Sequence, residues 1–254
     1  MKTLLLDADI IAYDVSTAAQ TNSEFGSYVT ESEASWKDSV HRAVRYFMEM
    51  HDCKKAILPL TDPNSNFRKK VLPSYKEKRH GVKAQPRPLI LADVKAYMSE
   101  CYETPLWESL EGDDVLCVLQ TTLDCETIIV STDKDMRTCT GLIFAPHRPE
   151  VGVIDVTKLQ ADQFLMWQTL TGDSTDGYGG CKGIGKKSPY ALEVLEAEAD
   201  ELWDIVVEGY ESKGFTEEDA LVQARCAKIL TADHYNIDTG EIRLWEPSDL
   251  EMDV

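Results

Sequence analysis

Five short clusters of acidic residues recur along this 254-residue chain, and their oxygens are suited to metal chemistry. The clusters are Asp7 and Asp9 in LLLDADII, Asp62 in PLTDP, Glu111, Asp113 and Asp114 in LEGDDVL, Asp133 and Asp135 in VSTDKDM, and Asp173 and Asp176 in GDSTDG. Gathering so many negative charges is unfavourable unless cations neutralise them. Carboxylate ligands without a nearby Cys or His pattern favour Mg²⁺ or Mn²⁺ over Zn²⁺.

The elements that must position these acids are strands and helix starts. Asp7, Asp62 and Asp133 each follow an apolar run that predicts a buried strand, and Glu111 opens a helical pattern. The carboxyl ends of parallel strands gather at one edge of a sheet, so these residues are expected to converge. Strands alternate with helical patterns through about residue 171, which predicts an α/β fold: a mainly parallel central sheet flanked by helices. We expect this core over residues 1–171 and a C-terminal helical region over residues 172–254.

Each acidic cluster has a simpler explanation when it is taken alone. Asp62 before proline is ordinary turn chemistry, and the acids of EGDD suit the positive end of a helix dipole. A strand followed by D-x-D also opens the haloacid-dehalogenase phosphohydrolases, in which Asp7 would be a nucleophile. The GDSTD segment imitates that family's late acidic motif. A phosphatase is therefore an alternative function for this chain. Five clusters at such positions argue against a purely structural role for the acids.

The segment GDSTDGYGGCKGIGKK, residues 172–187, has the pattern of a helix-hairpin-helix that holds DNA phosphates without reading bases. Glycines let consecutive backbone N–H groups face one anion at the start of the next helix, and lysines add positive charge. The simpler alternative is a glycine-rich turn that caps a helix. The residues concerned are Gly180, Lys182, Gly183, Gly185, Lys186 and Lys187.

Charge is distributed unevenly along the chain. The formal net charge is −19, and residues 193–254 alone hold 18 acidic and 4 basic side chains. Residues 67–87 instead hold eight Lys and Arg against the single Glu77. Local charge decides where a phosphate docks, so a nucleic-acid partner is not excluded. In this basic segment an aromatic residue precedes a cation twice, at Phe67-Arg68 and Tyr75-Lys76, a pairing that suits an unpaired base and its phosphate; a solvated basic loop is the alternative.

The seven cysteines form no C-x-x-C pair. This favours reduced thiols in a cytoplasmic protein over a disulfide framework or a zinc site.

With these motifs in this order, the chain resembles the 5′-nuclease, or flap endonuclease, superfamily, and within it the exonucleases of short-tailed coliphages. The resemblance covers nearly the whole chain. It is carried by LLLDADI, TDPNSNFRKKVLPSYKEKR, LEGDDVL, STDKD and GDSTDGY.

The resemblance implies roles for individual residues. Asp7, Asp62, Glu111 and Asp113 match the ligands of a first metal, and Asp133, Asp135, Asp173 and Asp176 those of a second; Asp9 and Asp114 stand beside matched ligands. Tyr75 and Lys76 match a stacking aromatic and a catalytic lysine at the base of a helical arch, here a basic segment over about residues 67–95. Arg79 and Arg68 match phosphate contacts, and Arg79 would also offset charge at the reaction. Phe67 and Lys83 are further candidate DNA contacts from the composition of the basic segment. The Gly183–Lys187 hairpin matches one that grips duplex DNA and binds K⁺ in relatives.

The activity that the resemblance implies is divalent-metal-dependent 5′-to-3′ cleavage of duplex DNA in phage replication or recombination. Blunt ends, nicks and flaps are expected substrates, as is RNA paired to DNA, and two Mg²⁺ or Mn²⁺ ions are the expected cofactors. The host cytoplasm is the expected location, with no membrane contact, and the acidic C-terminal region is left for an unknown protein partner. The alternatives are the phosphatase, a structure-specific DNA-binding protein without catalysis, and a ribonuclease of the related PIN type.

Overall fold

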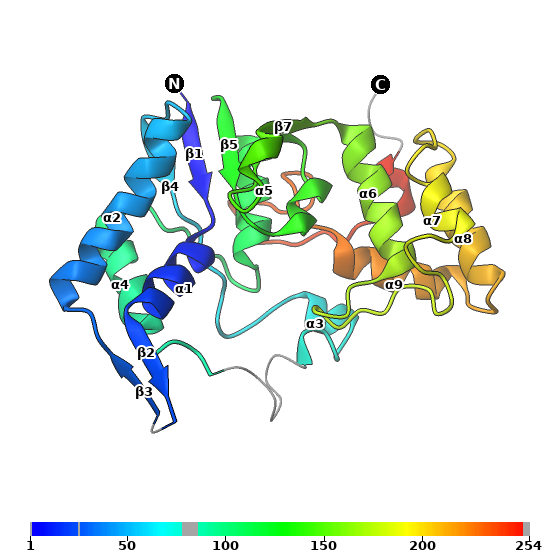
Figure 1. Ribbon diagram of the computed structural model, residues 1–254. Coiled ribbons are helices and arrows are strands. Elements are labelled where there is room, and N and C mark those ends of the chain that lie inside the picture. Colours follow the sequence, from blue (N-terminus) through cyan, green and yellow to red (C-terminus); the bar gives the residue numbers. More distant parts are fainter. Residues whose placement is uncertain (1, 25, 78–85, 251–254) are drawn as a thin grey trace. The chain divides into compact units, whose positions relative to one another are not determined.

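The computed structural model describes residues 2–24, 26–77 and 86–250, which form two compact units (Figure 1). The first unit comprises residues 1–65, 85–133 and 141–155, and the second comprises residues 66–84, 134–140 and 156–254. The chain therefore passes between the units several times. The boundary expected at residue 171 lies at the end of a helix that belongs wholly to the second unit.

The first unit is built on a five-stranded sheet of order β4-β1-β5-β6-β7. Strand β1 pairs in parallel with both β4 and β5, and β5 pairs in parallel with β6. The strands are β1 (Thr3–Leu6), β4 (Lys55–Ile57), β5 (Thr127–Val130), β6 (Gly141–Phe144) and β7 (Val153–Val156). Strands buried on both faces read as unbroken apolar runs, and TLLL and TIIV are fully buried here.

Helices cover both faces of this sheet. Alternate residues of a strand point to opposite faces. Leu4 and Leu6 of β1 lie in one apolar cluster with residues of α1 (Ala8–Ala18), α2 (Glu33–Met50) and α4 (Leu91–Cys101), which Figure 1 draws together beside β1. Helix α5 (Gly112–Thr122) contacts β1 and β5 separately from that cluster. The hairpin β2 (Gln20–Ser23) and β3 (Gly26–Val29) is mostly exposed.

The second unit is mainly helical. Its apolar cluster joins α6 (Lys158–Thr171), α7 (Pro189–Glu193), α8 (Leu202–Glu211) and α9 (Glu217–Ala227) to Tyr75 and Trp245. Short elements complete the chain: α3 (Arg68–Val71) and the 3-10 turns η2 (Lys134–Thr138), η3 (Pro149–Val151) and η4 (Pro247–Leu250). Among the described residues, no helix has the length and apolar character needed to cross a membrane.

The predicted fold class is confirmed, while several element ends differ. The apolar run before Asp62 forms a strand only to Ile57, beyond which Leu58 and Leu60 donate to carbonyls of residues 103 and 105. Helix α6 is capped by Thr157, because the Thr157 hydroxyl and Gln160 form a capping box. Five cysteines are free thiols as expected, but Cys117 and Cys139 are disulfide-bonded, so the expectation of reduced thiols is wrong for those two.

Candidate metal centre and nucleic-acid interface

Asp7 stands at the junction of β1 and α1. Its carboxylate caps α1 by accepting from the N–H groups of Asp9 and Ile10, and its other oxygen accepts from the Ser131 hydroxyl at 2.9 Å. Burial, helped by the charges of Asp9 and Asp133, raises the pKa of Asp7 to about 6. The protein thus holds a buried carboxyl group that resists ionisation unless a cation neutralises it.

Asp133 lies just beyond β5 and is tied to the same serine. Its backbone N–H donates to the Ser131 hydroxyl at 3.0 Å, so one residue links the Asp7 and Asp133 clusters. Asp9, on the first turn of α1, forms an ion pair with Lys95 of α4. The convergence expected at this sheet edge is therefore present for these three acids.

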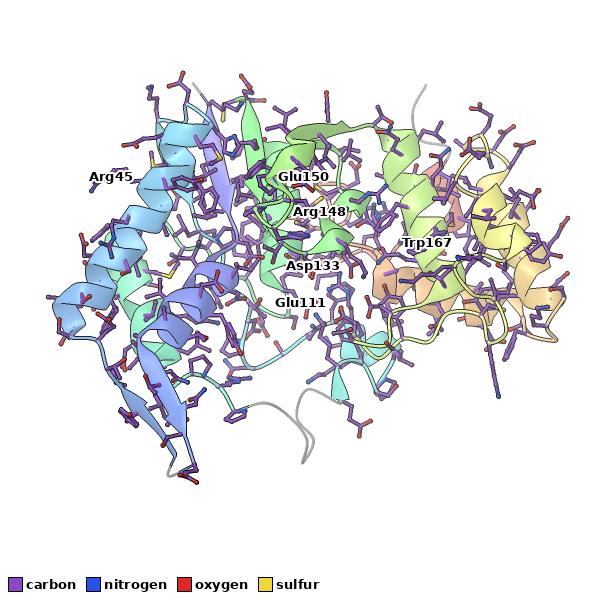
Figure 2. All side chains as sticks on the ribbon, in the orientation of Figure 1. Arg45, Glu111, Asp133, Arg148, Glu150 and Trp167 are labelled. Atoms are coloured by element: carbon purple, nitrogen blue, oxygen red, sulfur yellow. The ribbon has the colours of Figure 1, made fainter. Side chains whose placement is uncertain are left out.

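Asp62 and the start of α5 form a second group in the first unit. The Asp62 carboxylate accepts from the N–H groups of Asn64 and Ser109 and from the Ser65 hydroxyl, and these bonds hold the pKa of Asp62 below its usual value. The Gly112 N–H donates to the Thr61 hydroxyl, which ties the helix start to this loop. Figure 2 labels Glu111 at the start of α5 and Asp133 beyond β5.

Asp114 has a structural role at this helix start. Its carboxylate accepts from the Glu111 N–H and completes a capping box, and the residue is 0 % exposed. The Glu111 side chain in turn accepts from the Asp114 N–H, so the helix-end alternative considered for the EGDD acids applies to both residues of the capping box. Glu111 and Asp113 remain candidate ligands.

In the second unit, Asp135 and Asp173 share one cation. The Lys134 ammonium donates to Asp135 Oδ1 at 2.6 Å and also bonds Asp173 Oδ2. Gln168 of α6 donates to the same Asp135 oxygen at 2.6 Å. Although burial alone would raise the pKa of Asp173, Lys134 and the backbone N–H groups of residues 175 and 176 hold that pKa below its usual value.

Asp176 is held by the segment that carries the proposed catalytic lysine. Its carboxylate accepts from the Tyr75 hydroxyl at 3.2 Å and pairs with the Lys76 ammonium at 3.3 Å. The Lys76 N–H donates to the Asp176 carbonyl, and Lys76 has a left-handed φ of +55°. A left-handed non-glycine residue is strained, and such residues concentrate at functional sites.

Three residues of the basic segment differ from the roles expected of them. Arg68 is 0 % exposed and its guanidinium donates to the carbonyls of Cys226 and Lys228, so it joins chain segments and is not available to a phosphate. Phe67 is 4 % and Tyr75 is 2 % exposed, so neither ring is open for base stacking. Arg79 and Lys83 lie outside the described residues.

The glycine-rich segment is partly as expected. Lys182, Gly183, Gly185, Lys186 and Lys187 are all exposed while Ile184 between them is buried, so the segment presents backbone and ammonium groups together. The Gly180 N–H, however, donates to the Gln223 side chain. Helix α7 after the segment has only five residues, so the predicted helix-hairpin-helix stays a prediction.

No group of three or more His, Cys, Asp or Glu side chains poised to hold a metal occurs within residues 2–24, 26–77 and 86–250. The acids instead form smaller groups with local hydrogen bonds and lysine partners. Sequence reasoning missed Ser131, Lys95, Gln168 and Lys134. Only Lys134 carried a signal, because it stands between two candidate ligands in STDKD.

No protein-family model matches the chain. Individual relatives do: the exonuclease of Escherichia phage T7 is 28% identical over 96% of this chain and 93% of its own length. The flap endonuclease Xni of Shewanella pealeana is 32% identical over 63% of this chain and 65% of its own length. Together these sequence matches decide the family.

The chain belongs to the flap endonuclease superfamily of 5′-nucleases.

Solved members of this superfamily share the fold. The phage T5 5′-exonuclease with bound zinc superposes with a TM-score of 0.65 at 15% identity, covering 89% of this chain and 91% of that chain. A T5 D15 flap endonuclease complex with DNA and metal ions superposes with a TM-score of 0.59 at 15% identity, covering 89% of this chain and 93% of that chain. The parallel sheet with flanking helices is thus the superfamily's architecture.

Proposed function

We propose that this 5′-nuclease is a divalent-metal-dependent 5′-to-3′ exodeoxyribonuclease that acts at duplex DNA ends and also cleaves flaps. The observation that carries the proposal is a match over almost the whole chain to a protein named exonuclease. In this chain, Asp7 and Glu111 stand at the starts of α1 and α5, as the proposal requires of candidate ligands. The similarity to flap endonuclease Xni supports the second activity.

The residues present fit divalent metal ions. The acids supply only oxygen donors, the chemistry that Mg²⁺ and Mn²⁺ prefer. Asp7 carries a raised pKa that a cation would relieve, and in the second unit an ammonium already binds two candidate ligands at once. We assign Asp7, Asp62, Glu111 and Asp113 to one Mg²⁺ or Mn²⁺ ion, and Asp133, Asp135, Asp173 and Asp176 to a second.

The metal ions would supply an activated water and stabilise the leaving 3′ oxygen. The chain's own residues prepare for this. Ser131 fixes the direction of the Asp7 carboxylate, and Ser65 and Ser109 fix that of Asp62. Lys76, held beside Asp176, would place positive charge near the reacting phosphate, where it stabilises negative charge that develops in the transition state.

DNA would be held through its backbone. Lys182, Lys186 and Lys187 are exposed around Gly183 and Gly185, an arrangement suited to phosphate contacts and to a K⁺ ion. Backbone contacts carry no base information, so RNA paired to DNA would also be accepted. We place the activity in the host cytoplasm during phage DNA replication or recombination, and assign the acidic C-terminal region to a protein partner.

The test uses 5′-labelled blunt, nicked, flapped and RNA-primed duplexes with Mg²⁺, and reads product lengths. We expect short 5′-phosphorylated products from wild type and none from Asp133→Asn. Asp38→Asn, which alters an exposed acid paired only with Arg42 in the described contacts, should cleave normally. Release of inorganic phosphate without chain cleavage would favour the phosphatase. Binding without any cleavage would favour a non-catalytic DNA-binding protein.

A further inference from the structure

Lys134 has an unusual place among the acids of the second unit. It follows Asp133, precedes Asp135, and begins the 3-10 turn η2, while its ammonium reaches Asp173, 39 residues along the chain. Two candidate metal ligands therefore bind one nitrogen. Because an ammonium is a compact cation that needs oxygen acceptors, it occupies the kind of position a divalent ion would take.

The two carboxylates are oriented by bonds that do not depend on Lys134. Gln168, 1 % exposed on α6, donates to Asp135 Oδ1. Asp173 Oδ1 accepts from the backbone N–H of Thr175 at 2.7 Å, which leaves Oδ2 directed at the ammonium. Loss of the lysine bonds would leave these two carboxylates directed by their own supports.

Lys134 is free to leave, unlike its partners. Its side chain is 47 % exposed, whereas those of Asp135 and Asp173 are 9 % and 12 % exposed. Lys76 offers a contrast, because its side chain is only 13 % exposed and its backbone is bonded to Asp176. A long flexible stem with an exposed body can move into solvent without disturbing the core.

Two nearby buried polar atoms are also suited to the water carried by a hydrated cation. Among the described residues, the Tyr178 hydroxyl and Gln168 Oε1 are buried without a hydrogen-bond partner. The Tyr178 carbonyl accepts from the Asp173 N–H at 2.8 Å, so this tyrosine lies beside a candidate ligand. Buried polar atoms normally find a partner, and a hydrated cation would bring water to these two.

We infer that Lys134 is the resident counter-ion of the second metal site: it holds Asp135 and Asp173 at one point until a divalent cation displaces it. This inference rests on the proposed function, which requires a metal there. Lys134 then acts as a positioning residue that lowers apparent metal affinity, since metal binds only the fraction of molecules in which the lysine has moved away.

The test is a titration of the full chain with Mn²⁺ in the absence of DNA. The electron paramagnetic resonance signal of free Mn²⁺ measures how much of the ion is bound. The site in question is the one that Asp173→Asn removes. Lys134→Met should tighten this site by about fivefold to tenfold, as expected if the lysine occupies it in most molecules. Lys158→Met is the matched control, because Lys158 also bonds two acceptors in the second unit, Asp162 and the Asp249 carbonyl. This variant should change the Mn²⁺ affinity by less than about twofold, as expected of a residue that is not linked to metal binding.

Thermal unfolding gives an independent readout. In EDTA, Lys134→Met should unfold at a lower temperature than wild type, because Asp135 and Asp173 lose an ammonium partner. Added Mn²⁺ should then raise its unfolding temperature by more than it raises that of wild type. Unchanged or weaker Mn²⁺ affinity in Lys134→Met, with wild-type binding intact, would overturn the role of Lys134 alone. Absence of Mn²⁺ binding in every variant would overturn this inference and the metal-dependent function together.

Discussion

At the scale of single residues, the candidate acids Asp7 and Asp62 are held in place by neutral donors. Asp7 accepts from Ser131 and from two helix N–H groups, and Asp62 accepts from two backbone N–H groups and Ser65. These bonds fix direction, but at Asp7 they do not offset the cost of burying the charge. An ionised Asp7 therefore destabilises the folded chain until a cation neutralises it, and this cost can be measured.

Asp7→Asn tests that cost. The folded pKa of about 6 lies above the ordinary aspartate pKa of 3.8, so the folded state binds the proton more tightly than the unfolded state. Stability therefore falls as pH rises from about 4 to about 6, by at most about 3 kcal/mol. Asparagine also caps helices well. In EDTA at pH 7.5 the variant should be more stable than wild type by up to this amount, with little difference near pH 4, as measured by urea unfolding.

Asp38→Asn serves as the control for this measurement, because Asp38 is exposed and pairs with Arg42 on the same helix. Its stability should stay within about 0.5 kcal/mol of wild type at both pH values. An Asp7→Asn protein that is less stable than wild type at pH 7.5 without metal would show that Asp7 is ionised and satisfied by its hydrogen bonds.

Residue types were readable from the sequence, but some roles were not. The spacing of acids after apolar runs located Asp7 and Asp133 correctly at strand ends. The pairing of aromatic and cation at Phe67-Arg68 predicted an exposed DNA contact, yet Arg68 is buried against carbonyls of residues 226 and 228. Burial of that kind depends on a partner about 160 residues away, which local sequence does not reveal.

At the scale of elements, the loop between α6 and α7 is closed by glycine contacts. The backbone of Gly172 lies against that of Gly179 and Gly180, and residues 173 and 178 form an antiparallel bridge. Asp173 and Asp176 are carried on this closed loop. Gly180 was predicted to help receive an anion, but Gly180 and Gly172 are required for close backbone approach.

Gly172→Ala should disrupt this loop. A Cβ there would lie 2.3 Å from the Gly179 carbonyl carbon, and the φ of +68° is unfavourable for alanine. We expect a loss of at least about 2 kcal/mol in the free energy of unfolding. Gly185→Ala is the matched control, since its Cβ would meet nothing within 4 Å; its effect should stay within about 0.5 kcal/mol. If urea unfolding gave the same loss of unfolding free energy for Gly172→Ala and Gly185→Ala, the loop would have to open readily to make room for the Gly172→Ala methyl group.

Element type was more predictable than element extent for a physical reason. Apolar runs and capping residues report burial and helix starts, so the mainly parallel sheet and the helix that begins after Glu111 were predicted from them. The run before Asp62 ends its strand pairing at Ile57 because the next hydrogen-bond partners are carbonyls of residues 103 and 105 rather than a strand. Which partner completes a ladder is a tertiary property.

At the scale of the whole molecule, acidic and basic residues are concentrated in different stretches of the chain. The chain carries a formal net charge of −19, yet Lys182, Lys186 and Lys187 lie exposed around two glycines. Phosphate binding releases condensed counterions in proportion to the phosphates neutralised, whatever the net charge of the protein. The salt dependence of DNA binding therefore measures how many cations contact the backbone, separately from the overall repulsion.

The triple variant in which Met replaces Lys182, Lys186 and Lys187 should show a weaker salt dependence of DNA binding. The plot of the logarithm of the DNA-binding constant against the logarithm of the salt concentration should become less steep by about 2 to 3, because each phosphate contact contributes about 0.9. Fluorescence anisotropy of a labelled duplex in EDTA, over a range of KCl concentrations, measures this without cleavage. Lys54→Met with Lys55→Met is the control, since these lysines pair with Asp52 and Glu103, and the slope should not change. A triple variant that weakens binding at every salt concentration with an unaltered slope would mean that these lysines act on the fold of the glycine segment and not on phosphates. An unchanged affinity would place the duplex contacts elsewhere, since the remaining basic groups would then be sufficient to overcome the negative charge of the chain.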